Sequence, residues 1–172
     1  MKQEIENAID RQDSVGGILE TVISGVEAGI GEPSFSSLES MLSEAIFSIP
    51  AVKGIEFGSG FDFANMYGSE ANDAWIIQDN KVITKTNHNG GINGGISNGM
   101  PITFKTVIKP TPSISLEQDS VNYETKENVK LSISGRHDPA IIHRARAVVD
   151  AMTALVIADA YMMTYGRKWF EK

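Results

Sequence analysis

The sequence has no cysteine among its 172 residues. This absence excludes disulfides, thiolate nucleophiles and cysteine zinc sites, and it fits a reducing compartment such as the cytoplasm. Basic residues are also scarce, because 15 lysines and arginines stand against 22 acidic residues and give a net charge of -7. With no basic stripe, nucleic acid is not an expected partner. Any anionic ligand must therefore be held by local cations that act against the overall charge.

Long apolar runs are absent as well. No unbroken run reaches the roughly 18 residues that cross a bilayer, and residues 1–12 are charged and carry no apolar signal core. We therefore expect no membrane span and no secretory signal. A chain of 172 residues that is 41% hydrophobic and 22% charged is typical of a soluble globular protein. Residues 1–172 are expected to form a single domain.

The periodicity of apolar residues predicts both strands and helices. Residues 102–108 alternate apolar and polar positions, as a half-buried strand does. Residues 141–165 carry apolar positions at helical spacing and predict one long, buried helix. Further elements are a helix after the capping-box pair Ser36 and Glu39, strands near 18–24 and 51–57, a hairpin turning at Asp79-Asn80, and a short strand near 114–116. Because they show no strict βαβ rhythm, we predict an α+β fold with sheet packed on helices.

Residues 87–99 hold five glycines and four asparagines in thirteen positions. No regular element favours that composition. Glycines allow backbone N–H groups to approach a flat or anionic ligand, but the same composition also suits a set of tight turns. The pattern is not a dinucleotide fingerprint, since a strand and not a helix follows it.

The segment Lys109-Pro110-Thr111-Pro112-Ser113 follows the predicted strand directly. An ammonium group and two hydroxyls held by rigid prolines can donate hydrogen bonds to phosphate. The alternative is a strand terminator with a solvated lysine, and composition alone favours that alternative.

The turn Gly135-Arg136-His137-Asp138-Pro139 places a guanidinium, an imidazole and a carboxylate in consecutive positions before the long helix. Arg136 can clamp a carboxylate or phosphate, and Asp138 can move a proton. The competing explanation is that Asp138 caps the final helix, with Pro139 at its first position. A helix start also attracts anions, so both roles can hold together.

The remaining polar residues give weaker signals. The histidines form no HxxxH or HExxH pattern, which disfavours a histidine metal site, and no metal is expected. Three acids could pair as catalytic carboxylates, although solvated loop acids are the commoner case. The histidines are His88, His137 and His143, and the three acids are Asp62, Glu70 and Asp73.

Taken in order, several strings of this sequence closely resemble the chorismate synthase family over nearly the whole chain. The matching strings lie at residues 13–17, 29–33, 49–58, 90–97, 109–111 and 135–139. The resemblance implies helices sandwiched between antiparallel sheets, a cytoplasmic homotetramer and a lyase of the shikimate pathway for aromatic amino-acid biosynthesis. The family eliminates phosphate from 5-enolpyruvylshikimate 3-phosphate in an anti-1,4 sense to give chorismate, and it requires reduced FMN without net redox change.

The resemblance also implies roles for individual residues. Pro50 and Ala51 line the flavin through backbone groups, and Gly94 lets the flavin lie against the chain. Arg136 holds FMN or the anionic groups of the substrate. Asp138 resembles the family aspartate near flavin N5, which helps to remove the proton that the flavin takes from the substrate. The FMN phosphate and neighbouring atoms are contacted by the segment Lys109, Pro110, Thr111, Pro112 and Ser113, in which Pro112 replaces a serine common in the family.

The family is about twice as long as this chain, and its N-terminal segments with catalytic histidines and substrate-binding arginines have no counterpart here. We therefore expect residues 1–172 to correspond to the C-terminal half of a chorismate synthase and to be inactive without the other half. The alternative is a non-catalytic flavin- or phosphate-binding module, or a structural fragment of the same fold. In either case we expect the glycine loop, the lysine-proline segment and the turn before the long helix to share one cleft.

Overall fold

A three-stranded antiparallel sheet forms the centre of the computed structural model, which describes residues 1–135 and 137–166. Its strand order is β1-β7-β2, with β1 at Gly17–Ile23, β7 at Ile102–Ile108 and β2 at Val52–Phe57. The alternation of β7 is confirmed, because Ile102, Phe104 and Ile108 are buried. Strand β7 lies between β1 and β2, and the predicted site residues flank its two ends.

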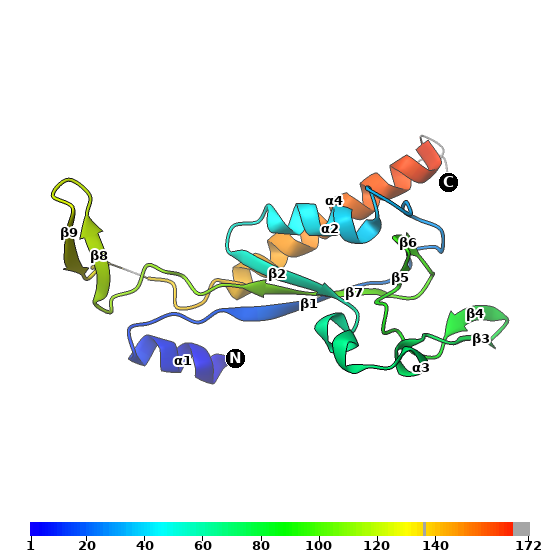
Figure 1. The fold of residues 1–172 in the computed structure, drawn as a ribbon, viewed down its shortest axis with the longest axis horizontal. Helices are drawn as coiled ribbons and strands as arrows, with labels where there is room; N and C mark the ends of the chain where they lie inside the picture. The colour runs from blue at the N-terminus through cyan, green and yellow to red at the C-terminus, as the bar shows by residue number, and fades with distance from the viewer. Residues whose placement is uncertain (136, 167–172) are drawn as a thin grey trace.

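Two helices cover one face of this sheet (Figure 1). Helix α2 spans Leu38–Phe47 and buries Leu38, Leu42 and Ile46, which recur every four residues on one side. Helix α4 spans Ile142–Tyr165, as its spacing predicts, and packs against both α2 and β1. The observed α+β class with antiparallel sheet and helices confirms the predicted fold class.

Helix α4 leaves much of its apolar surface exposed. Its 24 residues are long and apolar enough to cross a membrane by length and composition alone, contrary to the expectation that no segment would be. Core helices of soluble proteins pass the same test, so one such helix is weak evidence for a membrane. Only 28% of its most apolar window is buried here, and the exposed residues are Val148, Leu155, Met162 and Met163.

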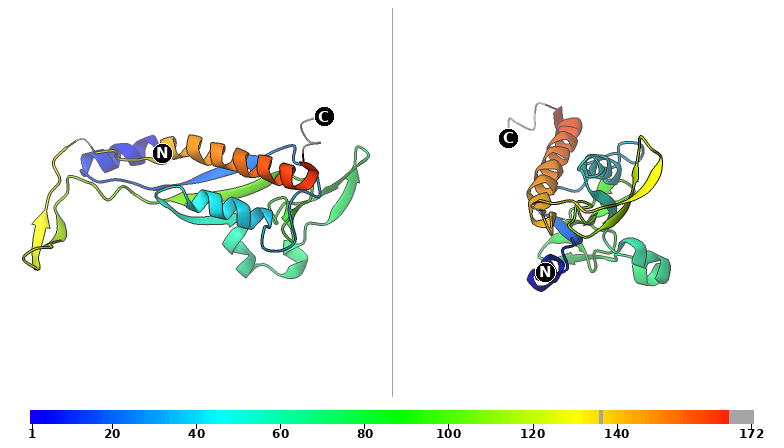
Figure 2. Two further views of the ribbon diagram at one scale, coloured as in Figure 1. Left: turned by 90° about the horizontal axis from the view of Figure 1, so that it is seen from above. Right: turned by 90° about the vertical axis from the view of Figure 1, so that its left-hand side faces the viewer.

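Shorter elements surround this centre. Figure 2 shows that the hairpin of β8 and β9 projects far from the sheet, while the hairpin of β3 and β4 lies toward the opposite end. The hairpin turn at Asp79 and Asn80 is confirmed, since both residues have positive φ. The bounds are α1 Lys2–Asp10, the 3-10 helix η1 Gly60–Asn65, α3 Gly68–Ala71, β3 Trp75–Gln78, β4 Lys81–Thr84, β5 Ile92–Asn93, β6 Ile96–Ser97, β8 Gln118–Asn122 and β9 Glu127–Leu131.

Two local predictions are wrong. The short strand expected at residues 114–116 is absent, and β8 begins at Gln118 instead, where it pairs with β9. The cap of α2 is Ser37 and not Ser36, because the Ser37 hydroxyl accepts a hydrogen bond from Ser40 N at 3.1 Å. Adjacent serines offer the same cap chemistry, so sequence alone could not choose between them.

Candidate functional site

The end of β7 and the turn before α4 lie together, and we call this region the proline-turn site. It comprises Ala51, residues 109–113 and residues 137–139. The Lys109 amide donates to the Ala51 carbonyl at 2.9 Å, Ser14 Oγ donates to the Thr111 carbonyl at 2.6 Å, and the Val15 amide donates to the Pro139 carbonyl at 2.8 Å. These three bonds tie four separate segments of the chain into one region.

Ala51 joins the site through an unusual backbone conformation. Its φ of 73° lies in the left-handed region, which a residue with a Cβ adopts at a cost of about 1 kcal/mol or more. Pro50, directly before it, is exposed. The conformation turns the chain between α2 and β2 and directs the Ala51 carbonyl to the Lys109 amide.

Two polar groups of the proline-turn site have no partner among the described residues. Thr111 Oγ1 is buried and makes no hydrogen bond within residues 1–135 and 137–166. Lys109 forms no ion pair within the same residues. A buried hydroxyl without a partner costs about 1–3 kcal/mol. The end of β7 therefore carries one hydroxyl and one ammonium group without a partner among the described residues.

Hydrogen bonds fix both ring nitrogens of His137. Nε2 lies 2.9 Å from the Ile133 carbonyl, which can only accept, so Nε2 carries the proton. In the neutral ring Nδ1 is then an acceptor, and Ser113 Oγ donates to it across 3.2 Å. The imidazole thus links the lysine-proline segment to the turn before α4.

Asp138 faces Arg144 and does not cap α4. Helix α4 begins at Ile142, its N-cap is Ile141, and no side chain caps it, so the capping alternative is wrong. One Asp138 oxygen accepts weakly from the Ala140 amide at 3.4 Å, and the other forms an ion pair with Arg144 Nη2. Asp138 and Arg144, with His137 and Pro139, line a cavity of about 580 Å³. Arg136, predicted to bind an anion here, lies outside the described residues.

The loop that carries Gly94 has its own anchor, the buried carboxylate of Asp73. This carboxylate accepts hydrogen bonds from Thr86 Oγ1 at 2.7 Å, the His88 amide at 2.8 Å, and the Asn89 amide and Nδ2 at 2.9 and 3.0 Å. Burial alone would raise the pKa of Asp73, but the hydrogen bonds outweigh it and hold the pKa below its ordinary value. The sequence indicates Asp73 only as a possible catalytic acid and does not predict that it anchors the loop. The one signal for this role is an acid close in sequence to an asparagine-rich loop.

Gly94 itself turns the hairpin of β5 and β6 with a φ of 58°. A Cβ at Gly94 would meet no atom within 4 Å, whereas one at Gly95 would lie 2.4 Å from the Glu32 carbonyl oxygen. Open space therefore lies beside Gly94, as contact with a flat ligand would require.

The glycine loop and the proline-turn site lie at opposite ends of β7, so the expectation of one shared cleft is wrong for the loop. The strand that separates them has seven residues, which corresponds to about 20 Å. Helix α2 separates the same two regions. The Gly95 carbonyl accepts a hydrogen bond from Leu38 N at the start of α2, whereas Ala51 follows the end of α2. Figure 1 shows β5 and β6 far from the start of α4.

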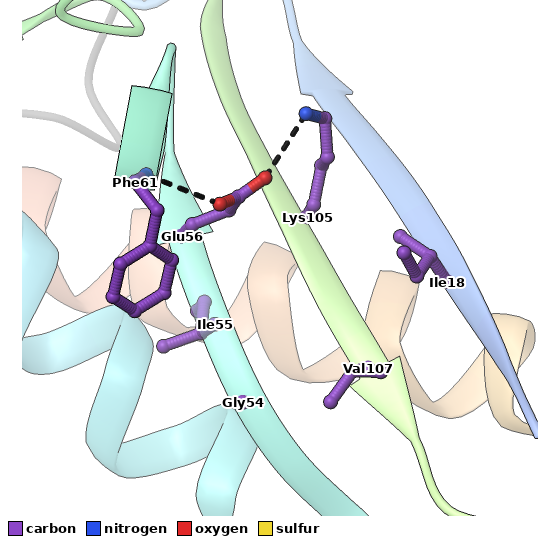
Figure 3. Close-up of a pocket in the computed structure, with 7 residues that line it drawn as sticks. All are labelled: Ile18, Gly54, Ile55, Glu56, Phe61, Lys105 and Val107. Carbon is purple, nitrogen blue, oxygen red and sulfur yellow. Dashed lines mark hydrogen bonds and ion pairs between the residues drawn. The ribbon is translucent and has the colours of Figure 1, made fainter. Parts of the chain in front are cut away.

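A smaller cavity of about 180 Å³ lies on the sheet face opposite α2 and α4 (Figure 3). Lys105 Nζ lies 3.0 Å from Glu56 Oε1, and the Phe61 amide donates to Glu56 Oε2 at 3.3 Å. The hydrogen bond from Lys105, followed by that from Phe61, holds the pKa of Glu56 below its ordinary value. Its charged groups already satisfy each other, so this cavity is a weaker ligand site than the proline-turn site.

The fold and the proline-turn site define an α+β protein with a polar cavity at the start of its longest helix. The family model described as chorismate synthase matches residues 1–162. The chain belongs to the chorismate synthase family.

Individual relatives agree with this assignment. A chorismate synthase of Lachnoclostridium phytofermentans is 52% identical over 98% of this chain and 47% of its own length. One of Archaeoglobus fulgidus is 52% identical over 88% of this chain and 42% of its own length. A solved crystal structure of chorismate synthase superposes with a TM-score of 0.76 at 28% identity, over 96% of this chain and 42% of that chain. The chain thus spans less than half the length of these relatives.

Proposed function

We propose that this chain supplies the flavin-binding part of a chorismate synthase, the lyase that eliminates phosphate from 5-enolpyruvylshikimate 3-phosphate to give chorismate. The observation that carries the proposal is the Thr111 hydroxyl, two residues after Lys109, which has no partner among the described residues, in a chain whose relatives are chorismate synthases. Reduced FMN, when bound, supplies the electron and proton chemistry of the reaction. The two unpartnered groups fit its phosphate, which a buried hydroxyl and a free ammonium group would bind.

The other residues of the proline-turn site then have consistent roles. The two prolines, Pro110 and Pro112, restrict the backbone so that Thr111 and Ser113 keep their positions. Pro50 and Ala51 would contact the ligand through backbone groups, and Arg136 would bind an anionic group of FMN or substrate. Asp138 lines the 580 Å³ cavity and would help to remove the proton that the flavin takes from the substrate.

Gly94 stands apart from this group. The length of β7, about 20 Å, separates the glycine loop from the proline-turn site, so the loop would reach a flavin only as a separate wall of the site. The open space beside Gly94 is compatible with such a contact. Contact between Gly94 and the flavin therefore stays a prediction from the family resemblance.

The exposed apolar face of α4 supports assembly with further protein. Leu155 is 64% exposed and Met163 53% exposed, which is unusual for the longest helix of a soluble fold. We propose that this face is covered by the part of the relatives that this chain does not match or by other copies in a cytoplasmic homotetramer. The chain alone is then expected to be inactive.

Titration of this chain with FMN, followed by flavin fluorescence, tests the binding role. We expect saturable micromolar binding that Lys109→Gln weakens at least tenfold, with little effect on riboflavin, which has no phosphate. The matched control is Lys85→Gln, because Lys85 is exposed and likewise forms no ion pair in the described part of the chain. Absence of saturable binding would instead favour a structural fragment.

Catalysis is tested by combining the chain with the separately made N-terminal part of the Lachnoclostridium relative. Chorismate formation that requires the two parts, reduced FMN and 5-enolpyruvylshikimate 3-phosphate together supports the proposal. Tight FMN binding without turnover in this mixture favours the alternative of a non-catalytic flavin-binding module.

A further inference from the structure

We propose that Arg144 is a positioning residue that holds the Asp138 carboxylate ionised and fixed toward the 580 Å³ cavity. Its Nη2 forms an ion pair with one carboxylate oxygen, while the Ala140 amide donates to the other oxygen at 3.4 Å. Two contacts on different oxygens restrict rotation of the carboxylate. The catalytic consequence rests on the proposed function, in which Asp138 helps to remove a proton.

The start of α4 does not by itself favour a cation at position 144. Arg144 is the third residue of the helix, and the first turn contains no acidic residue. A cation in the first turn opposes the helix dipole by about 0.3–1 kcal/mol. The position becomes favourable through Asp138, which lies just ahead of the helix.

Two further titratable groups among the described residues, His137 and Asp13, line cavities at this turn. His137 lines the same cavity, but its ring nitrogens bond Ser113 Oγ and the Ile133 carbonyl. Asp13 lines a neighbouring cavity that also contacts His137 and Pro139. Of the described residues, Arg144 alone forms an ion pair with Asp138. The Asp138 side chain is 23% exposed and that of Arg144 70% exposed, so solvent weakens the pair but leaves the carboxylate largely covered.

Carboxyl ¹³C NMR titration of this chain measures the protonation of Asp138 directly, with Asp138→Asn to assign its signal. We expect Arg144→Gln to raise the pKa of Asp138, because a nearby cation favours the ionised form of a carboxyl group. Arg144→Lys should restore part of the shift, since it keeps the charge without the planar fork. Arg146→Gln is the matched control on the same helix, and it should leave the titration unchanged.

The second measurement is the pH profile of chorismate formation by the chain combined with the N-terminal part of the Lachnoclostridium relative. If Arg144 positions a proton acceptor, Arg144→Gln moves the acidic limb of kcat upward by the same amount as the NMR shift. An unchanged Asp138 titration in Arg144→Gln, or an equal shift in Arg146→Gln, overturns the ion pair. A shifted titration with an unmoved acidic limb overturns the positioning role. Failure of the wild-type mixture to form chorismate overturns the proposed function, and the NMR result then decides the ion pair by itself.

Discussion

Replacing Thr111 with valine should change the stability of this protein and its affinity for ligand in opposite directions. Thr111 Oγ1 is buried without a hydrogen-bond partner in the described part of the chain. Valine has nearly the same shape and removes the polar atom. Because a buried hydroxyl without a partner costs about 1–3 kcal/mol, Thr111→Val should stabilise the free chain by about 1 kcal/mol. In a chain of this size that raises the Tm by about 2–4 °C.

The same substitution should weaken FMN binding. A hydrogen bond to a charged group such as phosphate contributes about 1.5–3 kcal/mol. Since 1.4 kcal/mol corresponds to a factor of ten, Thr111→Val should raise the Kd for FMN by about tenfold to a hundredfold. Thermal unfolding without ligand and flavin fluorescence titration measure the two effects on one preparation.

Thr106 provides a matched control. Its Oγ1 is also buried without a partner among the described residues, but it points into the core from β7. Thr106→Val should therefore stabilise the chain to a similar degree and leave FMN affinity unchanged, while Thr111→Ser keeps the hydroxyl and the affinity. Unchanged FMN affinity in Thr111→Val would refute the assignment of this hydroxyl to the ligand.

Three further predictions concern the loops and the surface. Asp73 has a lowered pKa in the folded chain, so the stabilisation by its carboxylate is complete above the unfolded pKa of about 3.8 and is lost as the pH falls through the folded pKa. Asp73→Asn should lower the unfolding free energy at pH 7 by about 2–3 kcal/mol and flatten its dependence on acid pH. Urea unfolding at several pH values measures both effects. Gly58→Ala should destabilise the chain by at least about 3 kcal/mol, because the new Cβ would overlap the His88 carbonyl oxygen. Gly94→Ala meets open space and should cost only about 1 kcal/mol, for the positive φ of this position. Equal losses of stability in thermal unfolding would contradict this difference. Leu155→Lys should change folding stability by less than about 0.5 kcal/mol yet reduce self-association in light scattering, and an unchanged oligomer would exclude the face of α4 as the contact.

Local patterns in the sequence predicted most of the regular structure. The alternation of β7, the helical spacing of α4 and the turn at Asp79-Asn80 each depend on neighbouring residues, so they can be read without tertiary information. Errors arose where neighbours offer equivalent chemistry, as with Ser36 and Ser37 at the start of α2. The short strand expected at residues 114–116 failed because pairing in the projecting hairpin begins at Gln118.

The sequence by itself determined the α+β class, the order of the elements and the family, because these depend on periodicity and on strings of residues along the chain. The tertiary structure decided which polar groups meet. Thr111 joins Ser14 across 97 positions and Asp73 holds Asn89 across 16, while the seven residues of β7 keep Gly94 apart from Lys109. Such contacts depend on how β7 and α2 separate the two ends of the sheet, and no local pattern records that distance.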